Sequence, residues 1–153
     1  MPSMNKTSIL LIVMGVFTGI SLYTFIYAKG WSYLTNNPKT CANCHIMQEQ
    51  FDGWIHSSHR NVAGCNTCHT PSDFFGKWYT KASNGFWHSF YFTSGTFPEP
   101  IQITRRSLKV TEKRCQECHA SLTQGMHGGG PDSGQRWCTR CHSSVGHLHL
   151  GDQ

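Results

Sequence analysis

The chain has 153 residues, of which 38% are hydrophobic, and its formal net charge is +5. A chain of this length normally forms one domain, but its apolar residues are too few outside the N-terminal segment for an ordinary core. No basic patch beyond Arg105-Arg106 accompanies the positive charge, which argues against a nucleic-acid partner.

Residues 8–28 (SILLIVMGVFTGISLYTFIYA) contain no charged side chain, with Lys6 before them and Lys29 after them. A helix of this length just spans the core of a bilayer. A cleaved secretory signal has a shorter apolar core and ends in small residues, and Ala28 keeps that alternative open. We predict a cytoplasmic N-terminus over 1–7, a transmembrane signal anchor over 8–28 and a cytochrome domain over 29–153.

All eight cysteines occur in Cys-x-x-Cys pairs, and a histidine follows every pair. The pairs are Cys41/Cys44, Cys65/Cys68, Cys115/Cys118 and Cys138/Cys141, followed by His45, His69, His119 and His142. A disulfide framework or two zinc sites also use paired cysteines, but neither needs that histidine. The pattern is typical of covalent c-type haem. It predicts a mostly α-helical or irregular domain packed around four haems, on the exported side of the membrane, where such haem is attached.

The first motif alone carries a methionine, Met47, two places after its histidine. Methionine is a normal axial ligand of haem iron in c-type cytochromes. So close to His45, however, it either competes for the same face of the iron or serves only in packing. The residues leave both interpretations open.

Four irons with two axial ligands each need four ligands besides the motif histidines, and six further histidines are present. We expect His59 and His147 to serve as ligands, because each lies near a motif in sequence without facing that motif's own iron. His56 and His149 each neighbour a better candidate. His127 lies in a glycine-rich stretch, residues 120–137, that predicts a surface loop.

Nine aromatic residues occur between Phe74 and Phe92. Ser72 or Asp73 is expected to cap a helix there, and Gly85 to break or kink it. The rings either pad haem faces or lie in the membrane interface with Lys77 and Lys81 extending toward water.

Taken together, the N-terminal anchor, the four motifs and the extended first motif CANCHIM resemble the NapC/NrfH family of tetrahaem quinol dehydrogenases. The resemblance covers essentially the whole chain, and the compact length most resembles the small subunits of cytochrome c nitrite reductases. It implies that Met47, and not His45, binds the first iron, which leaves an open haem face beside a quinol site. Lys81 would line that site. His88 stands where some members have an aspartate, and would either accept a quinol proton or ligate iron.

The resemblance also implies the other ligands. His119 with His147 would serve the third haem and His142 with His59 the fourth. The second would have His69 and a lysine from a catalytic partner, with no internal histidine in that place.

The implied function is oxidation of menaquinol from the quinone pool of the cytoplasmic (inner) membrane. The protein would be single-pass, with its haem domain in the periplasm, and would form a hetero-oligomer. Electrons would pass to the pentahaem catalytic subunit of a cytochrome c nitrite reductase, which makes ammonium from nitrite. The alternatives are a NapC-type quinol dehydrogenase that feeds another periplasmic reductase, and a small multihaem reductase that acts at an open haem.

Overall fold

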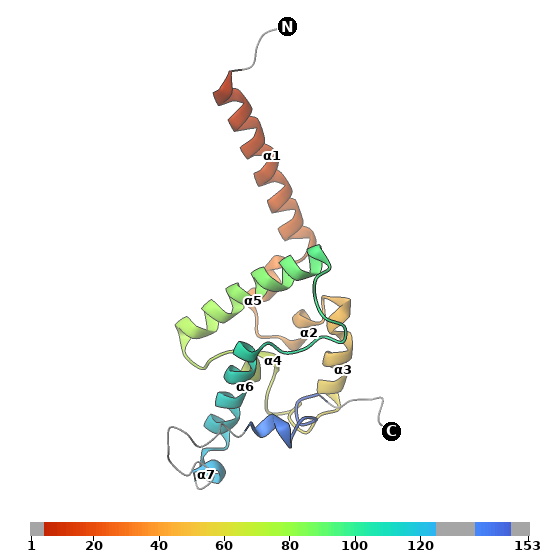
Figure 1. Ribbon diagram of the computed structural model, residues 1–153, viewed down its shortest axis with the longest axis vertical. Coiled ribbons are helices and arrows are strands. Elements are labelled where there is room, and N and C mark those ends of the chain that lie inside the picture. The colour runs from red at the N-terminus through yellow and green to blue at the C-terminus, as the bar shows by residue number, and fades with distance from the viewer. Residues whose placement is uncertain (1–4, 125–136, 148–153) are drawn as a thin grey trace. The chain divides into compact units, whose positions relative to one another are not determined.

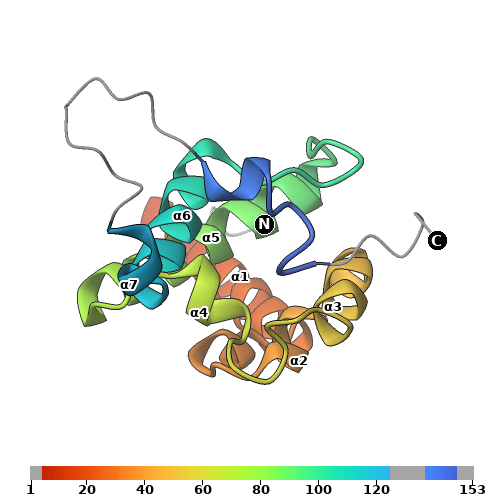
Figure 2. The same cartoon turned by 90° about the horizontal axis from the view of Figure 1, so that it is seen from below.

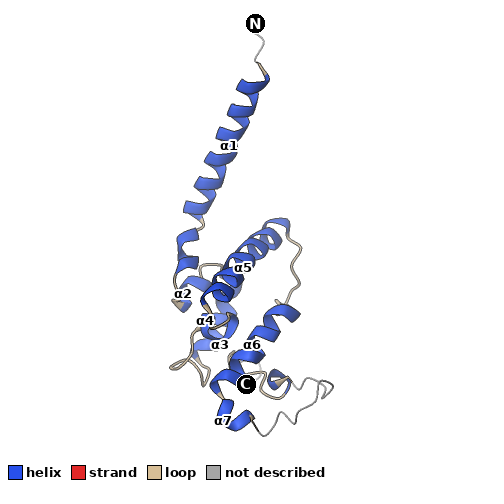
Figure 3. Cartoon of the chain, turned by 90° about the vertical axis from the view of Figure 1, so that its left-hand side faces the viewer, coloured by secondary structure: helices blue, strands red, loops and turns tan. Residues whose placement is uncertain are grey.

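The computed structural model describes residues 5–124 and 137–147, and within them every regular element is a helix (Figures 1 and 3). In chain order the elements are α1 (Lys6–Tyr27), η1 (Gly30–Leu34), α2 (Pro38–Cys41), η2 (His45–Met47), α3 (Gln48–Ile55), α4 (Cys65–His69), α5 (Phe74–Ser94), α6 (Arg105–Cys118), α7 (Ala120–Thr123) and η3 (Cys138–Arg140), where η marks a 3-10 helix. The chain divides into two compact units, Met1–Thr35 and Asn36–Gln153.

The first unit consists mainly of α1, a helix of 22 residues with no buried side chain. The Asn5 side chain caps its start by accepting a hydrogen bond from the Ser8 N–H at 2.7 Å. At 1.5 Å per residue the helix is about 33 Å long, and it is apolar all round. By length and composition it can cross a membrane. It begins two residues before the predicted segment.

The second unit carries all four cysteine motifs, and we refer to it as the haem domain. Its most extensive helix packing is between α4 and α6, which run side by side in Figure 2. Helix α5 lies at one end of this unit and α7 at the other (Figures 1 and 3). The second and third motifs, on α4 and α6, are therefore held together directly.

Helix α5 starts where Asp73 accepts a hydrogen bond from the Gly76 N–H at 2.6 Å, so Asp73 is the cap. It ends at Gly95, whose φ of 64° suits glycine. The expected break at Gly85 is wrong, because the helix runs unbroken from Phe74 to Ser94, whereas a kink there stays a prediction. One internal glycine costs only about 1 kcal/mol, which the rest of a long helix outweighs.

No hydrophobic side chain is fully buried within the described residues. The buried side chains there are polar or charged: Ser32, Ser57, Thr70, Thr80 and Glu112. Many large aromatic side chains are instead exposed, among them Phe75 at 83%. A polypeptide without an apolar core cannot offset the entropy lost on folding. The haem domain therefore needs another apolar component at its centre.

Candidate functional site

In three of the four cysteine motifs, the cysteines and the histidine lie on one continuous helical turn. The second occupies α4, from Cys65 to His69. In the third, the His119 N–H donates to the Cys115 carbonyl at 2.9 Å, and in the fourth the His142 N–H donates to the Cys138 carbonyl at 2.9 Å. Each turn presents two sulfurs and an imidazole together, as attachment to a porphyrin and ligation of its iron require.

The first motif is built differently. Helix α2 ends at Cys41, and Cys44 has an extended backbone (φ −84°, ψ 116°) before η2 begins at His45. His45 is exposed and its ring lies 6.1 Å from that of Phe92, whereas Met47 is half-buried. The histidine is therefore not carried on the same turn as Cys41, and the methionine is the more enclosed of the two candidate ligands.

The cysteines differ in how far the polypeptide encloses them. Cys44, Cys118 and Cys141 are exposed, whereas the other five are partly buried. Cys141 also lies just beyond η3, which ends at Arg140. A domain packed around its haems would be expected to enclose every attachment point, and the polypeptide alone does not enclose Cys141 or the other two. A haem lying against these sulfurs would cover them, and the assignment of these three cysteines as attachment points stays a prediction.

None of the eight cysteines is paired in a disulfide. The four motifs together with the missing apolar core fit four covalently bound haems, because each macrocycle supplies the apolar surface that the polypeptide lacks. Both the donor set and the packing thus point to the same prosthetic group.

Two pairs of histidine rings lie close together. The ring centroids of His59 and His119 are 6.1 Å apart, and those of His69 and His147 are 6.0 Å apart. The family resemblance implies that His119 pairs with His147 and His142 with His59, and that His69 has no internal histidine as its partner. Rings at this separation either bind opposite faces of one iron or ligate neighbouring haems, so the ligand pairing stays a prediction.

Hydrogen bonds orient two of the histidines that lie outside the cysteine motifs. The Nδ1–H of His147 donates to the Gln50 carbonyl at 2.8 Å, which leaves its Nε2 as the nitrogen that can bind a metal, as is usual for metal-binding histidines. His56 makes a similar bond to the Asp52 carbonyl at 2.8 Å, but it is exposed. His127 and His149 lie outside the described residues.

Burial, together with the neighbouring His147 and His88, lowers the pKa of His69 to about 4. Its imidazole is consequently neutral at physiological pH, which is the form that binds iron. His88 itself is exposed on α5.

Lys81 lies beside the first motif. Its Nζ donates to Asn36 Oδ1 at 3.4 Å and lies 5.2 Å from the centre of the Trp78 ring. Partial burial, with the charge of Lys77, lowers the pKa of Lys81, whereas its electrostatic interaction with Cys41 acts in the other direction. The Lys81 ammonium group is thus close enough to Cys41, a predicted attachment point of the first haem, to interact with it electrostatically.

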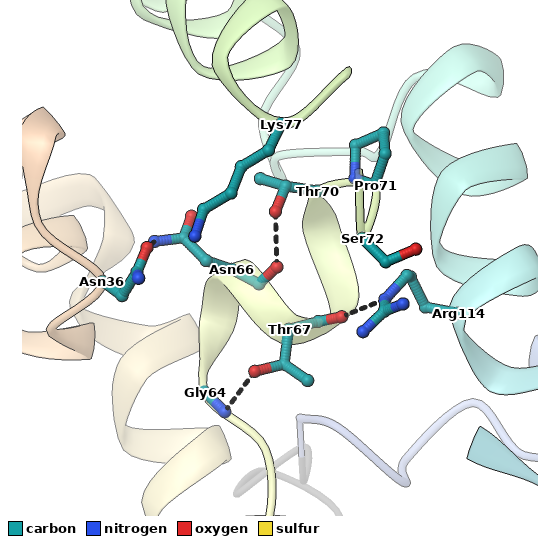
Figure 4. A pocket seen from close by; sticks show the side chains of 9 residues that line it. All are labelled: Asn36, Gly64, Asn66, Thr67, Thr70, Pro71, Ser72, Lys77 and Arg114. Atoms are coloured by element: carbon teal, nitrogen blue, oxygen red, sulfur yellow. Dashed lines mark hydrogen bonds between the residues drawn. The ribbon is translucent and has the colours of Figure 1, made fainter. Parts of the chain in front are cut away.

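A cavity of about 300 Å³ adjoins the second motif (Figure 4). Its lining is polar and includes two cations, Lys77 and Arg114, and no carboxylate. The Thr67 carbonyl accepts a hydrogen bond from Arg114 Nε at 2.8 Å, drawn as a dashed line in Figure 4. This bond joins the second motif to α6. None of the predicted axial ligands lines this cavity.

Two residues that the sequence did not single out connect haem motifs. One is Arg114. The other is Glu112, only 2% exposed, whose carboxylate accepts hydrogen bonds from Cys138 N at 2.7 Å, Thr139 N at 2.9 Å and Thr139 Oγ1 at 2.6 Å. Neither has a sequence signature, because their partners lie far away along the chain.

The helical fold and the four attachment motifs define a multihaem c-type cytochrome. The model of the NapC/NirT cytochrome c family, N-terminal region, matches residues 1–152. The cytochrome c-type protein NrfH of Wolinella succinogenes is 35% identical over 158 residues, covering 94% of this chain and 89% of that protein. The chain belongs to the NapC/NirT cytochrome c family.

Two further matches agree. The cytochrome c-type protein TorC of Escherichia coli K12 is 25% identical, over 95% of this chain and 43% of that protein. A chain in a crystal structure of the cytochrome c nitrite reductase NrfHA complex bound to the HQNO inhibitor has the same fold, with a TM-score of 0.65, 24% identity and 92% coverage of both chains. The family resemblance, the fold class and covalent haem are thereby confirmed.

Proposed function

We propose that this protein is a membrane-anchored tetrahaem quinol dehydrogenase that supplies electrons to the catalytic subunit of a cytochrome c nitrite reductase. The observation that carries the proposal is the broken first motif, with Met47 half-buried, His45 exposed and Lys81 close by. The similarity to NrfH and to a chain of the NrfHA complex supports this choice of partner.

Eight residues, 28–35, separate α1 from the haem domain in sequence, and a single crossing by α1 accounts for membrane anchoring. We place the haem domain in the periplasm, because c-type haem is attached outside the cytoplasm. In this arrangement residues 1–7 form the cytoplasmic N-terminus, residues 8–28 the transmembrane anchor and residues 29–153 the cytochrome domain.

Met47 would be the residue that holds the iron of the first haem, beside the quinol site. When bound, the haems accept electrons one at a time and pass them on. The ammonium group of Lys81 orients a hydroxyl oxygen of menaquinol by hydrogen bonding. His88, or a water beside it, accepts the protons released as quinol becomes quinone. Each quinol thus gives two electrons to the haems and two protons to His88 or to the water beside it.

The other ligands follow the motifs. His69, His119 and His142 would bind the second, third and fourth irons, and His59 and His147 would serve as ligands from the opposite faces. The orientation of His147 by Gln50 supports that role. A lysine from the catalytic subunit would complete the second haem, provided that His147 binds elsewhere.

The test uses the complete complex, purified from mildly solubilised membranes through a tag on this chain, in a host that attaches c-type haem and expresses the native partner genes. Nitrite loss driven by a reduced menaquinol analogue is measured with and without the co-purifying multihaem subunit. Nitrite loss that needs both chains supports the proposal. Haem reduction by quinol without nitrite loss rejects the partner, and absence of haem reduction rejects the quinol site.

Matched variants locate the site within the chain. Lys81→Gln should slow haem reduction by quinol, whereas Lys113→Gln, whose side chain is 74% exposed on α6, should not. Dithionite, which needs no quinol pocket, should reduce both variants fully. Equal rates of haem reduction by quinol in the two variants would show that Lys81 does not belong to the quinol site.

A further inference from the structure

Helix α5 exposes a row of aromatic side chains that the described residues leave largely uncovered, although the guanidinium group of Arg106 in α6 lies 5.6 Å from the centre of the Tyr79 ring. Phe75, Tyr79, Phe86 and Phe90 are 83%, 67%, 63% and 51% exposed, and we call them the aromatic stripe. At 3.6 residues per turn their spacing puts them on one side of the helix. Lys77, Thr80 and Asn84 lie on the other side, where α5 meets the rest of the haem domain.

This pattern reverses the usual amphipathic arrangement, in which the polar face of a helix points outward. Burying one large apolar side chain contributes about 1.5–3 kcal/mol, and four such side chains in one row exceed the scattered exposure normal for a protein surface. The stripe therefore needs an apolar environment that the described chain does not supply.

Chain connectivity indicates which environment is within reach. Helix α1 ends at Tyr27 and the haem domain begins at Asn36, so residues 28–35 form the whole connection. Eight residues span at most about 27 Å when fully extended. A bilayer crossed by α1 consequently stays close to the surface of the haem domain, whatever the arrangement of the two units.

The charge of α5 also suits a lipid surface. No aspartate or glutamate occurs between Phe74 and Pro98, whereas Lys77 and Lys81 do. Anionic headgroups attract such cations and repel carboxylates. Phenylalanine, tyrosine and tryptophan rings are favoured at the boundary between acyl chains and headgroups.

We propose that α5 lies in the membrane interface with the aromatic stripe among the lipids, as a second membrane contact besides α1. The inference rests on the anchoring by α1 in the proposed function. The opposite side of the same helix carries Lys81 and His88, so a quinol leaving the bilayer would pass the helix to reach them. A haem or a protein partner covering the stripe is the competing explanation, and either would leave Phe86 without lipid adducts.

The experiment introduces photoreactive benzoylphenylalanine in place of one residue at a time in the full-length holoprotein, in membranes that contain the native partner. The positions are Phe86 in the stripe, Phe17 in α1 and Leu122 in α7. Leu122 is 71% exposed and lies at the other end of the haem domain (Figures 1 and 3). After illumination, mass spectrometry identifies lipid and protein adducts. Haem content, from absorbance, confirms that each variant is folded.

We expect lipid adducts at Phe86 and Phe17 and none above background at Leu122. Lipid adducts at Phe17 together with only protein adducts, or none, at Phe86 would overturn the inference while leaving the anchor intact. Equal lipid labelling at Phe86 and Leu122 would also overturn it. Absence of lipid adducts at Phe17 would reject the anchor and the inference together.

Discussion

Replacing Glu112 by glutamine tests how the fourth haem motif is held. The carboxylate of Glu112 accepts three hydrogen bonds, from the backbone of Cys138 and from the backbone and hydroxyl of Thr139. Glutamine keeps one oxygen and turns an amide N–H₂ toward a backbone N–H. One buried donor then loses its acceptor, and the remaining bonds lose their charge assistance.

The general cost of leaving a buried donor unpaired sets the expected loss of stability. An unsatisfied buried donor costs roughly 1–3 kcal/mol, so Glu112→Gln should destabilise the holoprotein by about that amount. Guanidinium unfolding in detergent, followed by haem absorbance, measures it. Glu99→Gln is the matched control, because Glu99 is exposed and its replacement changes the net charge equally. Intact mass should also show fewer chains of Glu112→Gln carrying all four haems.

The pH dependence provides a second readout. Burial raises the pKa of Glu112, but the hydrogen bonds from Thr139 and Cys138 outweigh it and hold the pKa below the ordinary value of 4.5. A carboxyl group with a depressed folded-state pKa stabilises the fold fully above its unfolded pKa and ceases to do so as pH falls through the folded value. The stability gap between wild type and Glu112→Gln should therefore narrow below pH 4.5. Equal unfolding midpoints and equal haem loading at neutral pH would refute the reasoning.

Three other substitutions give distinct outcomes. Met47→Leu keeps the size of the side chain but removes the sulfur ligand, so the first haem should change its absorbance and quinol should reduce the haems more slowly; an unchanged spectrum would make Met47 a packing residue. Lys81→Gln should raise KM for the quinol analogue with little change in dithionite reduction, and Lys113→Gln should match wild type. Arg114→Leu breaks the 2.8 Å bond to the Thr67 carbonyl and should lower the free energy of unfolding by roughly 1–3 kcal/mol, measured by guanidinium titration; an unaltered midpoint would show that α4 and α6 do not depend on it.

The sequence predicted the components of the site better than their arrangement. A Cys-x-x-Cys-His motif indicates its chemistry within five residues, so the predicted haem attachment points could be recognised without the fold, although only three of the four motifs form the helical turn. The uncharged run over 8–28 likewise predicted α1 to within two residues. Gly85 was misjudged because a single local propensity was weighed without the length of helix around it.

The contacts between motifs could not be predicted in the same way. Glu112 reaches Cys138 across 26 residues, and His147 reaches Gln50 across 97. Such pairs depend on how short helices are brought together, and no periodicity marks them. The proximity of His59 to His119 and of His69 to His147 is of this kind, and the ligand pairing predicted from resemblance did not anticipate it.

The missing apolar core has a consequence for the amount of this protein that a cell maintains. Without its prosthetic groups the haem domain has little to hold its short helices together, so a chain that has received too few haems remains open to proteolysis. We therefore expect proteolysis to remove chains that lack some of their haems and to spare chains that carry all four. When iron is scarce, the number of molecules should fall, while those that persist remain fully loaded.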